Sequence, residues 1–247
     1  MTAEQQSVEH RIDIVLSPEL LPAYLQPGSV AVIIDVLRAS TTIVTALQHK
    51  ATAIYTLETV EEAERMARIG KLVGAERNVV RCPFARFGND PAEYTEAAVG
   101  GREIYFTTTN GTRTIKKAMA EGYDVVIGTF VNLSAVADYC RDRDVLAVCA
   151  GWQGRPSKED ALFAASLCDT LAETHRVVTD VSQMVVELWQ MHKGHLTDYI
   201  KESNHYPRMV AAGKEGALDY CLTTDATRTL PIARMEGESI KITTHKP

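Results

Sequence analysis

The sequence predicts an α/β protein with a mostly parallel central sheet between two layers of helices, a three-layer α/β/α fold. Two observations lead to this prediction. Short segments with strand character alternate with amphipathic helical segments between residues 11 and 173. Residues 29–36 form a nearly continuous apolar run, which is typical of a strand that is covered on both faces.

The expected strands are short and are bounded by turn residues. Residues 11–16 alternate apolar and polar side chains, as a half-buried strand does. The other strands are expected at 29–36, 53–57, 72–75, 103–106, 124–129 and 145–150. The tail, residues 232–245, also alternates, and we expect it to close the sheet as an edge strand.

The segments that follow these strands are expected to be helices. Acidic residues in the first turns of 59–69 favour a helix start there, because the helix dipole stabilises negative charge at that end. Asn132 precedes one helix as an N-cap, and Ser157 opens another with the spacing of a capping box. The expected helices are 40–47, 59–69, 112–120, 133–140 and 157–173. From 181 to 247 the chain is expected to be mostly helical, and residues 1–247 to form one domain.

Composition excludes several classes of protein. The formal net charge of −6 argues against general binding to nucleic acid or to an anionic membrane, which requires a basic face. The five cysteines form no CxxC pair, and the N-terminal residues lack the apolar stretch of a signal peptide. We therefore expect a cytoplasmic protein, with a homodimer as an open alternative.

Polar residues gather where the expected strands end, which is where open α/β sheets bind their ligands. Asp35 follows the second strand, and Arg38 lies three residues later. Asp35 could bind a metal or attack phosphorus, while Arg38 could bind phosphate oxygens. The alternative is an ion pair between the two that ties the strand to the next helix. An unpaired acid after an apolar strand is costly to bury, which favours the functional interpretation.

The segment Thr107-Thr-Thr-Asn-Gly-Thr112 resembles an anion cradle. It combines hydroxyl and amide groups with a glycine and the start of a helix, where backbone N–H groups are free to bind an anion. The alternative is an ordinary turn followed by an N-cap, because Asn-Gly is a frequent turn signal.

Further carboxylates are candidate metal ligands. Glu76, Glu159 and Asp160 follow two other strands, and Mg²⁺ needs only one or two carboxylates besides water and substrate oxygens. One of Glu159 and Asp160 could instead cap the helix that starts after Ser157. His192, His195 and His205 show no metal-binding spacing, and we expect them to be surface or packing residues.

Taken together, these segments resemble the 2-phosphosulfolactate phosphatase family, also called the ComB family. The likeness covers nearly the whole chain and rests on residues 35–42 (DVLRASTT), 74–77 (GAER), 87–91 (FGNDP), 107–112, Asn132, 150–151 and 159–160. One loop departs from the family pattern: Arg86 stands where an acid is usual, and Asp90 stands where the family has Ser.

The resemblance implies a Mg²⁺-dependent phosphatase whose substrate is a small phosphorylated 2-hydroxy acid. In the family this is 2-phosphosulfolactate, and the product, sulfolactate, leads toward coenzyme M. Asp35 and Arg38 would be catalytic, and Asp35, Glu76 and Asp160 would hold the metal. The expected substrate-binding residues are Arg77, Asn89, Thr108, Thr109, Asn110, Gly111, Thr112 and Asn132.

A second hypothesis is a non-catalytic protein that senses a phosphorylated or sulfonated metabolite, and the altered loop at Arg86 and Asp90 motivates it. A nucleotide-binding transferase is a weaker alternative, because the sequence contains neither a P-loop motif nor a GxGxxG motif after a strand.

Overall fold

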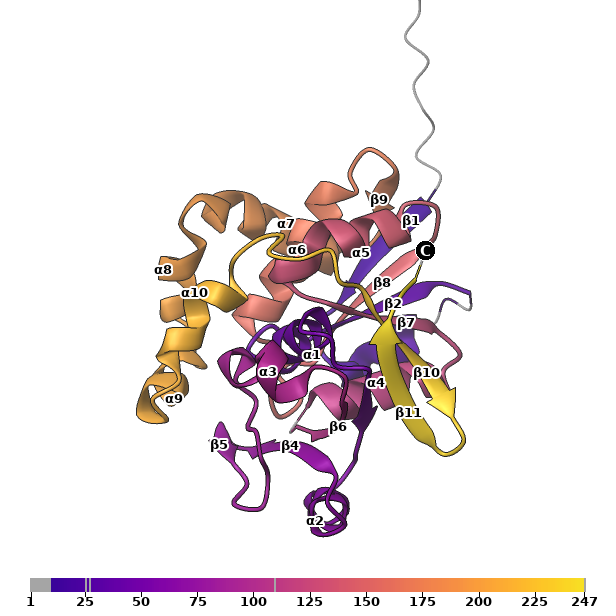
Figure 1. Cartoon of the computed structure of the whole chain (residues 1–247). Helices are drawn as coiled ribbons and strands as arrows, with labels where there is room; N and C mark the ends of the chain where they lie inside the picture. The colour runs from indigo at the N-terminus through magenta and orange to yellow at the C-terminus, as the bar shows by residue number, and fades with distance from the viewer. Residues whose placement is uncertain (1–9, 25, 27, 109, 247) are drawn as a thin grey trace, which may run out of the picture.

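The computed structural model describes residues 10–24, 26, 28–108 and 110–246. Within these residues an 11-stranded mixed sheet runs through the molecule, in the order β5-β4-β6-β3-β11-β10-β7-β2-β8-β1-β9 (Figure 1). The strands are β1 His10–Val15, β2 Val30–Ile34, β3 Ala53–Thr56, β4 Leu72–Arg77, β5 Val80–Arg81, β6 Glu103–Thr107, β7 Asp124–Gly128, β8 Val145–Cys149, β9 His175–Val177, β10 Pro231–Glu236 and β11 Ser239–Thr244.

Helices follow most of the strands, which confirms the predicted α/β class. The α-helices are α1 Ala39–Gln48, α2 Val60–Arg68, α3 Glu96–Val99, α4 Gly111–Ala120, α5 Leu133–Cys140, α6 Lys158–Thr170, α7 Asp180–His192, α8 Leu196–Lys201, α9 Tyr206–Ala211 and α10 Leu218–Cys221. Short 3-10 turns occur at Pro18–Tyr24, Pro91–Glu93, Phe130–Asn132, Lys193–His195 and Glu215–Ala217. No helix in the described residues is both long and apolar enough to span a bilayer.

Side chains that alternate along β2 separate the two helical layers. Val30, Val32 and Ile34 pack with α5, α6 and α7, while Ala31 and Ile33 pack with α1 and α4 on the opposite face. All five residues of β2 are buried, as expected for a strand with helices on both sides. The sheet is therefore the middle layer of a three-layer structure.

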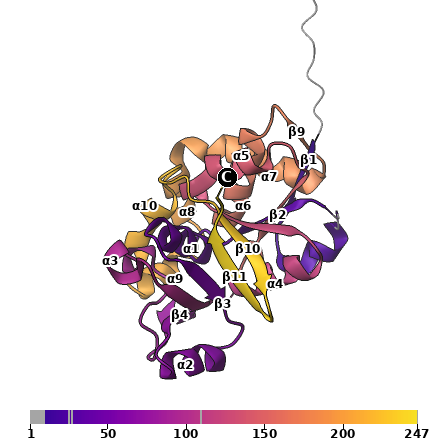
Figure 2. The ribbon, with the colours of Figure 1, turned by 45° about the vertical axis from the view of Figure 1, so that its right-hand side comes forward.

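The C-terminal strands lie in the middle of the sheet, so the expected edge strand is wrong. β10 and β11 form an antiparallel hairpin, and β11 pairs on its outer side with β3 (Figure 2). β10 pairs on its outer side with β7. The alternating pattern of 232–245 identified strand structure correctly. It does not indicate which partners the strand has, because the pairing is decided by residues far away in the sequence.

The hairpin separates two parallel blocks of the sheet. One block contains β4, β6 and β3, and the other contains β7, β2, β8, β1 and β9. Three successive antiparallel pairings connect them, so the blocks run in locally opposite directions. Strand twist of about 20–25° per step accumulates to roughly 100° between β6 and β2. This twist turns the carboxyl ends of both blocks toward a shared region.

Two helix starts differ from the expected capping. Neither Asn132 before α5 nor Ser157 before α6 makes a side-chain cap hydrogen bond. Asn132 instead belongs to the preceding turn, where its Oδ1 accepts a hydrogen bond from the Thr129 N–H at 3.0 Å. In α2, by contrast, Thr59 and Glu62 form a complete capping box.

Candidate active site

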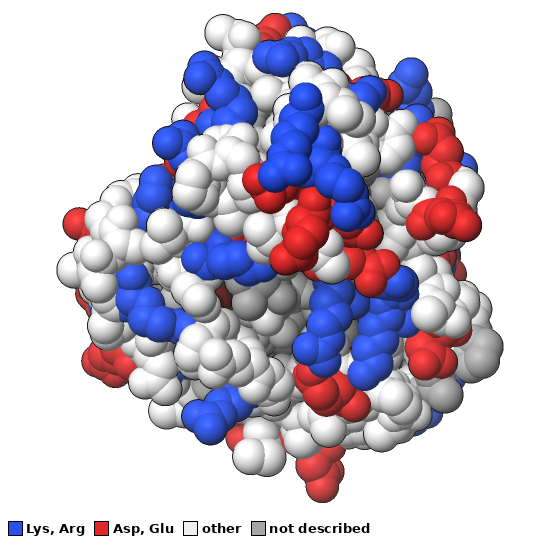
Figure 3. Space-filling view, turned by 90° about the horizontal axis from the view of Figure 1, so that it is seen from below, with Lys and Arg blue, Asp and Glu red and all other residues white. Residues whose placement is uncertain are grey.

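A small cleft of about 50 Å³ lies where the carboxyl ends of the two parallel blocks meet. It is bordered by residues from six separate stretches of the sequence. Of the residues predicted from the sequence, the cleft is lined by Asp35, Glu76, Asn89, Thr108, Asn110 and Asp160. Figure 3 shows the molecule from below, where basic and acidic side chains border a hollow in the surface. The polar segments that follow β2, β4, β6 and β8 thus share one cavity.

Asp35 follows β2 and lies at the start of α1. Its Oδ1 accepts a hydrogen bond from the Ala39 N–H at 3.2 Å. The pKa of Asp35 is raised to about 6, mainly by burial and in smaller part by the nearby carboxylates of Glu76 and Glu159, against the opposing effects of the Ala39 N–H and His205. The Asp35 carboxyl therefore titrates close to neutral pH, which suits a group that must accept a proton or a metal ion.

Gly111 allows α4 to begin beside Asp35. A Cβ atom at this position would lie 3.1 Å from Oδ2 of Asp35 and 3.4 Å from Oγ1 of Thr108. Oγ1 of Thr108 is buried and has no hydrogen-bond partner within the described residues. The first turn of α4, Asp35 and an unpaired hydroxyl therefore lie together, as an anion-binding junction requires.

The other members of the segment 107–112 lie in different places. Asn110 lines the cleft, and its side chain makes no cap hydrogen bond to α4. Thr112 is buried and lines a separate cavity near α4 and the hairpin rather than this cleft. Thr109 lies outside the described residues.

Asp160 fastens the ends of two neighbouring strands. Its Oδ1 accepts a hydrogen bond from the Val36 N–H at 2.8 Å, and its Oδ2 accepts one from the Gly151 N–H at 3.0 Å. Burial raises the pKa of Asp160 well above its ordinary value, with Glu159 and Asp35 adding to the effect. Asp160 is thus an anchor for the loops after β2 and β8 as well as a member of the cleft.

Glu76 lies at the end of β4 and holds the turn to β5. Its Oε1 accepts a hydrogen bond from the Val79 N–H. Asn78 and Val79 have positive φ angles of 52° and 71°, a conformation that is unfavourable for a β-branched residue. The buried carboxylate therefore stabilises a strained turn at the wall of the cleft.

The donor set fits a magnesium ion bound by few protein ligands. Asp35, Glu76, Glu159 and Asp160 are carboxylates around one cleft, and Oε2 of Glu159 is buried without a hydrogen-bond partner. In the described part of the chain, no three His, Cys, Asp or Glu side chains are grouped closely enough to form a complete protein cage for a metal. Mg²⁺ usually keeps several waters and uses one or two carboxylates, so the fit is to an open site.

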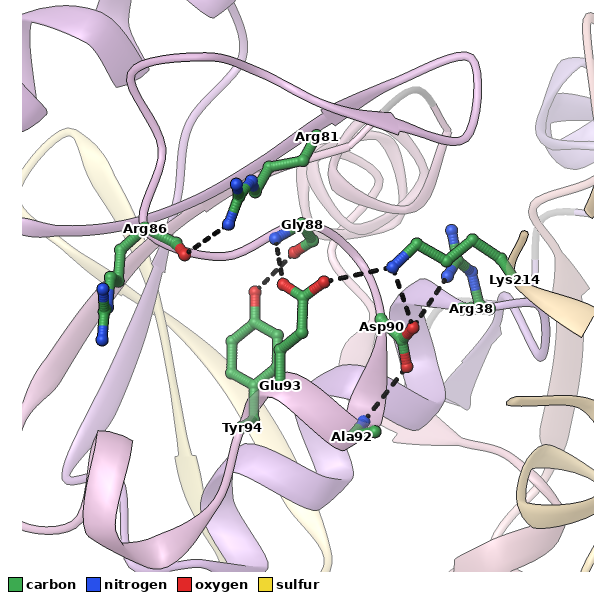
Figure 4. A network of polar contacts seen from close by, with 9 residues as sticks. All are labelled: Arg38, Arg81, Arg86, Gly88, Asp90, Ala92, Glu93, Tyr94 and Lys214. Atoms are coloured by element: carbon green, nitrogen blue, oxygen red, sulfur yellow. Dashed lines mark hydrogen bonds and ion pairs between the residues drawn. The ribbon is translucent and has the colours of Figure 1, made fainter. Parts of the chain in front are cut away.

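Arg38 is buried, and the expected alternative of an ion pair with Asp35 is not formed. Its Nη1 lies 3.8 Å from Oδ2 of Asp90 and makes no hydrogen bond. Asp90 also accepts from Lys214 Nζ at 3.1 Å, and Lys214 lies 3.3 Å from Glu93 (Figure 4). Glu93 in turn accepts from the Gly88 N–H at 2.5 Å. Arg38 is therefore backed by a charged network that reaches the C-terminal helices.

Like Arg38, the side chains of Arg77 and Asn132 do not line the cleft. Arg77 donates to Oγ1 of Thr107 at 3.0 Å and to the Glu76 carbonyl at 2.7 Å. The Asn132 amide donates to the carbonyls of Ile127 and Thr229, both at 3.1 Å. Both side chains hold the polypeptide around the cleft.

Two lining residues were missed because they come from a distant helix. His205 and Arg208 lie at the start of α9, and both border the cleft. Nδ1 of His205 lies 2.7 Å from Oε1 of Glu159. The expectation that His205 is a surface or packing residue is therefore wrong. No spacing in the sequence indicates this contact, since it depends on how α9 folds back over α6.

Comparison with known proteins agrees with this arrangement of loops. The profile of a family described as 2-phosphosulpholactate phosphatase matches residues 15–236. The chain belongs to this family. The matched residues include every part of the cleft, from Asp35 to Arg208, as well as strand β10 of the central hairpin.

The relatives that match this family member align with most of its length. A probable 2-phosphosulfolactate phosphatase of Thermotoga maritima is 35% identical over 221 residues, which are 89% of this chain and 94% of the relative. One from Symbiobacterium thermophilum is 38% identical, covering 85% and 94% of the two chains. One from Clostridium perfringens is 30% identical, covering 86% and 89%.

The two departures from the family pattern have different surroundings in this family member. Arg86 is exposed and does not line the cleft, and its carbonyl accepts from Arg81 at 3.3 Å. Asp90 contacts Arg38 and Lys214, and the neighbouring Asn89 lines the cleft. Figure 4 shows that the Arg86 side chain points away from the network around Asp90. Only Asp90 is thus placed to influence the cleft.

Proposed function

We propose that the chain is a phosphatase that hydrolyses a small phosphorylated 2-hydroxy acid, converting 2-phosphosulfolactate to sulfolactate and phosphate. The observation that carries this proposal is the cleft itself, where Asp35, Thr108 and the start of α4 lie together. The family membership and the printed names of the relatives support the same reaction.

Asp35, with help from Glu76 or Asp160, would hold a magnesium ion. Mg²⁺ bound there would neutralise charge on the phosphoryl oxygens and make the phosphorus a better electrophile. Arg38, the Thr108 hydroxyl and the N–H groups at the start of α4 would bind phosphoryl oxygens. Stabilising the charge on these oxygens is the largest expected contribution to catalysis, because the donors are already held in place by the fold.

In the reaction, a new phosphorus–oxygen bond forms on one side while the bond to the substrate oxygen breaks. The attacking oxygen comes either from Asp35 or from a water molecule that gives its proton to Asp35. The leaving oxygen must gain a proton, and His205 is the neighbouring group that can donate one. With both ring nitrogens protonated, His205 donates from Nδ1 to Glu159, and its Nε2 makes no hydrogen bond within the described residues. The Nε2 proton is therefore free to pass to the leaving oxygen, and the neutral ring then regains a proton from water.

A cytoplasmic location is part of this proposal. All five cysteines are free and buried, which supports a reducing compartment.

Phosphate release, measured while Mg²⁺ is titrated, tests the proposal. The assay compares 2-phosphosulfolactate and 2-phospholactate with the wild type and with Asp35→Asn. We expect Mg²⁺-dependent turnover that falls by about 100-fold or more in Asp35→Asn, because a central stabiliser of the transition state is lost. Saturable binding of both compounds without phosphate release would instead support the metabolite sensor.

A further inference from the structure

Arg208 lies over the face of an aromatic ring at one wall of the cleft. Its guanidinium carbon lies 3.7 Å from the ring centroid of Trp152. Both side chains line the same cleft as Asp35. A cation–π contact of this kind restrains the guanidinium and uses none of its N–H donors, which stay free to bind an anion.

The ring that supports Arg208 is itself fixed by a tight loop. The backbone of Trp152 and Arg155 forms two hydrogen bonds, Trp152 N–H to Arg155 carbonyl at 2.8 Å and the reverse at 3.0 Å. Gly151 has a φ of 57°, and a Cβ there would lie 2.3 Å from the Arg155 carbonyl oxygen. The loop therefore requires glycine at this position and presents Trp152 in one place.

Arg208 lacks the partners that a partly buried cation usually has. Across the described residues, no carboxylate oxygen lies within 4.0 Å of its nitrogens. Its Nε is buried and has no hydrogen-bond partner. A buried donor without a partner is costly, so a guanidinium held in this state beside a substrate cleft indicates a site that an anion completes.

The space next to Arg208 is large enough for a second group of the substrate. An adjoining hollow of about 330 Å³ shares Trp152, Glu159, His205 and Arg208 with the cleft. Its rim carries the basic residues Arg155 and Lys158 and one further acid, Glu202. A substrate whose phosphoryl group lies near Asp35 can therefore extend toward Arg208.

We propose that Arg208 binds the second acid group of the substrate, a carboxylate or a sulfonate, and so selects phosphate monoesters that carry such a group close to the ester carbon. This inference rests on the proposed phosphatase function. Arg208 would form paired N–H···O bonds with the acid group, while Asp35, Arg38 and Thr108 bind the phosphoryl group. It is a specificity residue, and it takes no part in breaking the phosphorus–oxygen bond.

The test compares substrates that differ only in the second acid group. Isopropyl phosphate has none, 2-phospholactate has a carboxylate, and 2-(phosphonooxy)propane-1-sulfonate has a sulfonate. We expect Arg208→Met to lower kcat/KM about 10–100-fold for the acid that Arg208 recognises, mainly through KM, because a charge-assisted hydrogen bond is lost. Isopropyl phosphate should change by less than about threefold. Comparing the carboxylate with the sulfonate shows which acid group Arg208 binds.

Two further variants keep the test decisive. Arg65→Met removes an exposed arginine of α2 that lines neither the cleft nor the adjoining hollow, and should have little effect on any of the three compounds. Arg208→Lys keeps the positive charge but not the planar guanidinium, so its loss of kcat/KM should be smaller than that of Arg208→Met. It replaces Arg208→Met in the test if that variant fails to fold. An equal loss with all three compounds would overturn the inference.

Failure of the proposed function gives a different result. In that case the wild type releases no phosphate from any of the compounds. Calorimetric binding then decides the role of Arg208. Tighter binding of 2-phospholactate or the sulfonate than of isopropyl phosphate, lost in Arg208→Met, would support the inference, and equal binding of all three would contradict it.

Discussion

Nδ1 of His205 lies 2.7 Å from Oε1 of Glu159, a contact between side chains 46 residues apart in the sequence. Glu159 lies in the first turn of α6 and is almost fully buried, whereas His205 precedes α9. The carboxylate accepts the Nδ1 proton and so fixes the orientation of the ring. The pair thus brings a residue from the C-terminal helices to the cleft formed by the sheet.

This contact predicts that Glu159 and His205 act as a unit. His205→Gln and Glu159→Gln should each lower kcat by about 10–100-fold, because each change removes an oriented proton donor from the cleft. The double variant should lose little more than either single variant, since the second change then removes nothing further. Steady-state phosphate release measures this, and losses that multiply in the double variant would show that the two residues act independently.

The raised pKa of Asp35 predicts that the metal-free protein becomes less stable when this carboxyl ionises. Its pKa is about 6 in the fold and 3.8 as a reference, so folding favours the protonated form. Stability therefore falls as the pH rises through this window. Asp35→Asn should unfold at a higher temperature than wild type near pH 7.5, its free energy of unfolding being larger by up to about 3 kcal/mol, and the difference should shrink near pH 4.5.

Thermal unfolding in the presence of a chelator measures this difference. Asp142→Asn, which changes an exposed aspartate, is the matched control and should leave the unfolding temperature unchanged at both pH values. A loss of stability in Asp35→Asn near pH 7.5 would mean that the ionised Asp35 stabilises the fold, contrary to the burial argument.

Gly111→Ala should impair catalysis. The added methyl group would lie 3.0 Å from Cβ of Ala39 and 3.1 Å from Oδ2 of Asp35, so the carboxylate must move. We expect kcat/KM to fall by about tenfold or more, because small displacements of reacting groups are costly. Gly194→Ala, where the added methyl group meets no atom within 4 Å, is the control. Normal turnover in Gly111→Ala would contradict the placement of Asp35 in the reaction.

Asp90→Ser should destabilise the protein, because it leaves the buried Arg38 and the half-buried Lys214 without their shared partner. A loss of roughly 2–4 kcal/mol in urea unfolding is expected. Lys214→Met keeps Asp90 beside Arg38 and should cost less. Arg86→Glu, at an exposed position, should change stability by less than about 0.5 kcal/mol. Equal effects of Asp90→Ser and Arg86→Glu would show that the network contributes nothing to folding.

Local patterns in the sequence predicted most of the helices and strands. Helix α5 begins at Leu133 and ends at Cys140, as expected from its apolar spacing. The continuous apolar run at 29–36 became the central strand β2. Strand β9 was missed because its three residues are too few to show a period. The place of the hairpin in the sheet was missed for a different reason, since strand partners depend on contacts between distant segments.

The residues of the cleft also divide into those that local patterns reveal and those that depend on contacts between distant segments. Asp35, Glu76 and Asp160 could be found because each follows a strand, and strand ends can be located from the local pattern. His205 and Arg208 follow no strand, and they reach the cleft through packing of α9 that no local pattern encodes. Arg77 has the same position at a strand end as Glu76, but its side chain is held by Thr107. The position after a strand therefore predicts which segments meet and does not predict the direction of each side chain.

The central position of the hairpin has a consequence for synthesis on the ribosome. Until residues 231–244 have emerged, β3 and β7 lack the partners that join them, and the nascent chain carries two half-sheets with open edges. The walls of the cleft come from both half-sheets, so the cleft forms only after residues 231–244 have emerged and joined them. Before then, the unpaired edges of β3 and β7 are open to pairing with strands of other chains.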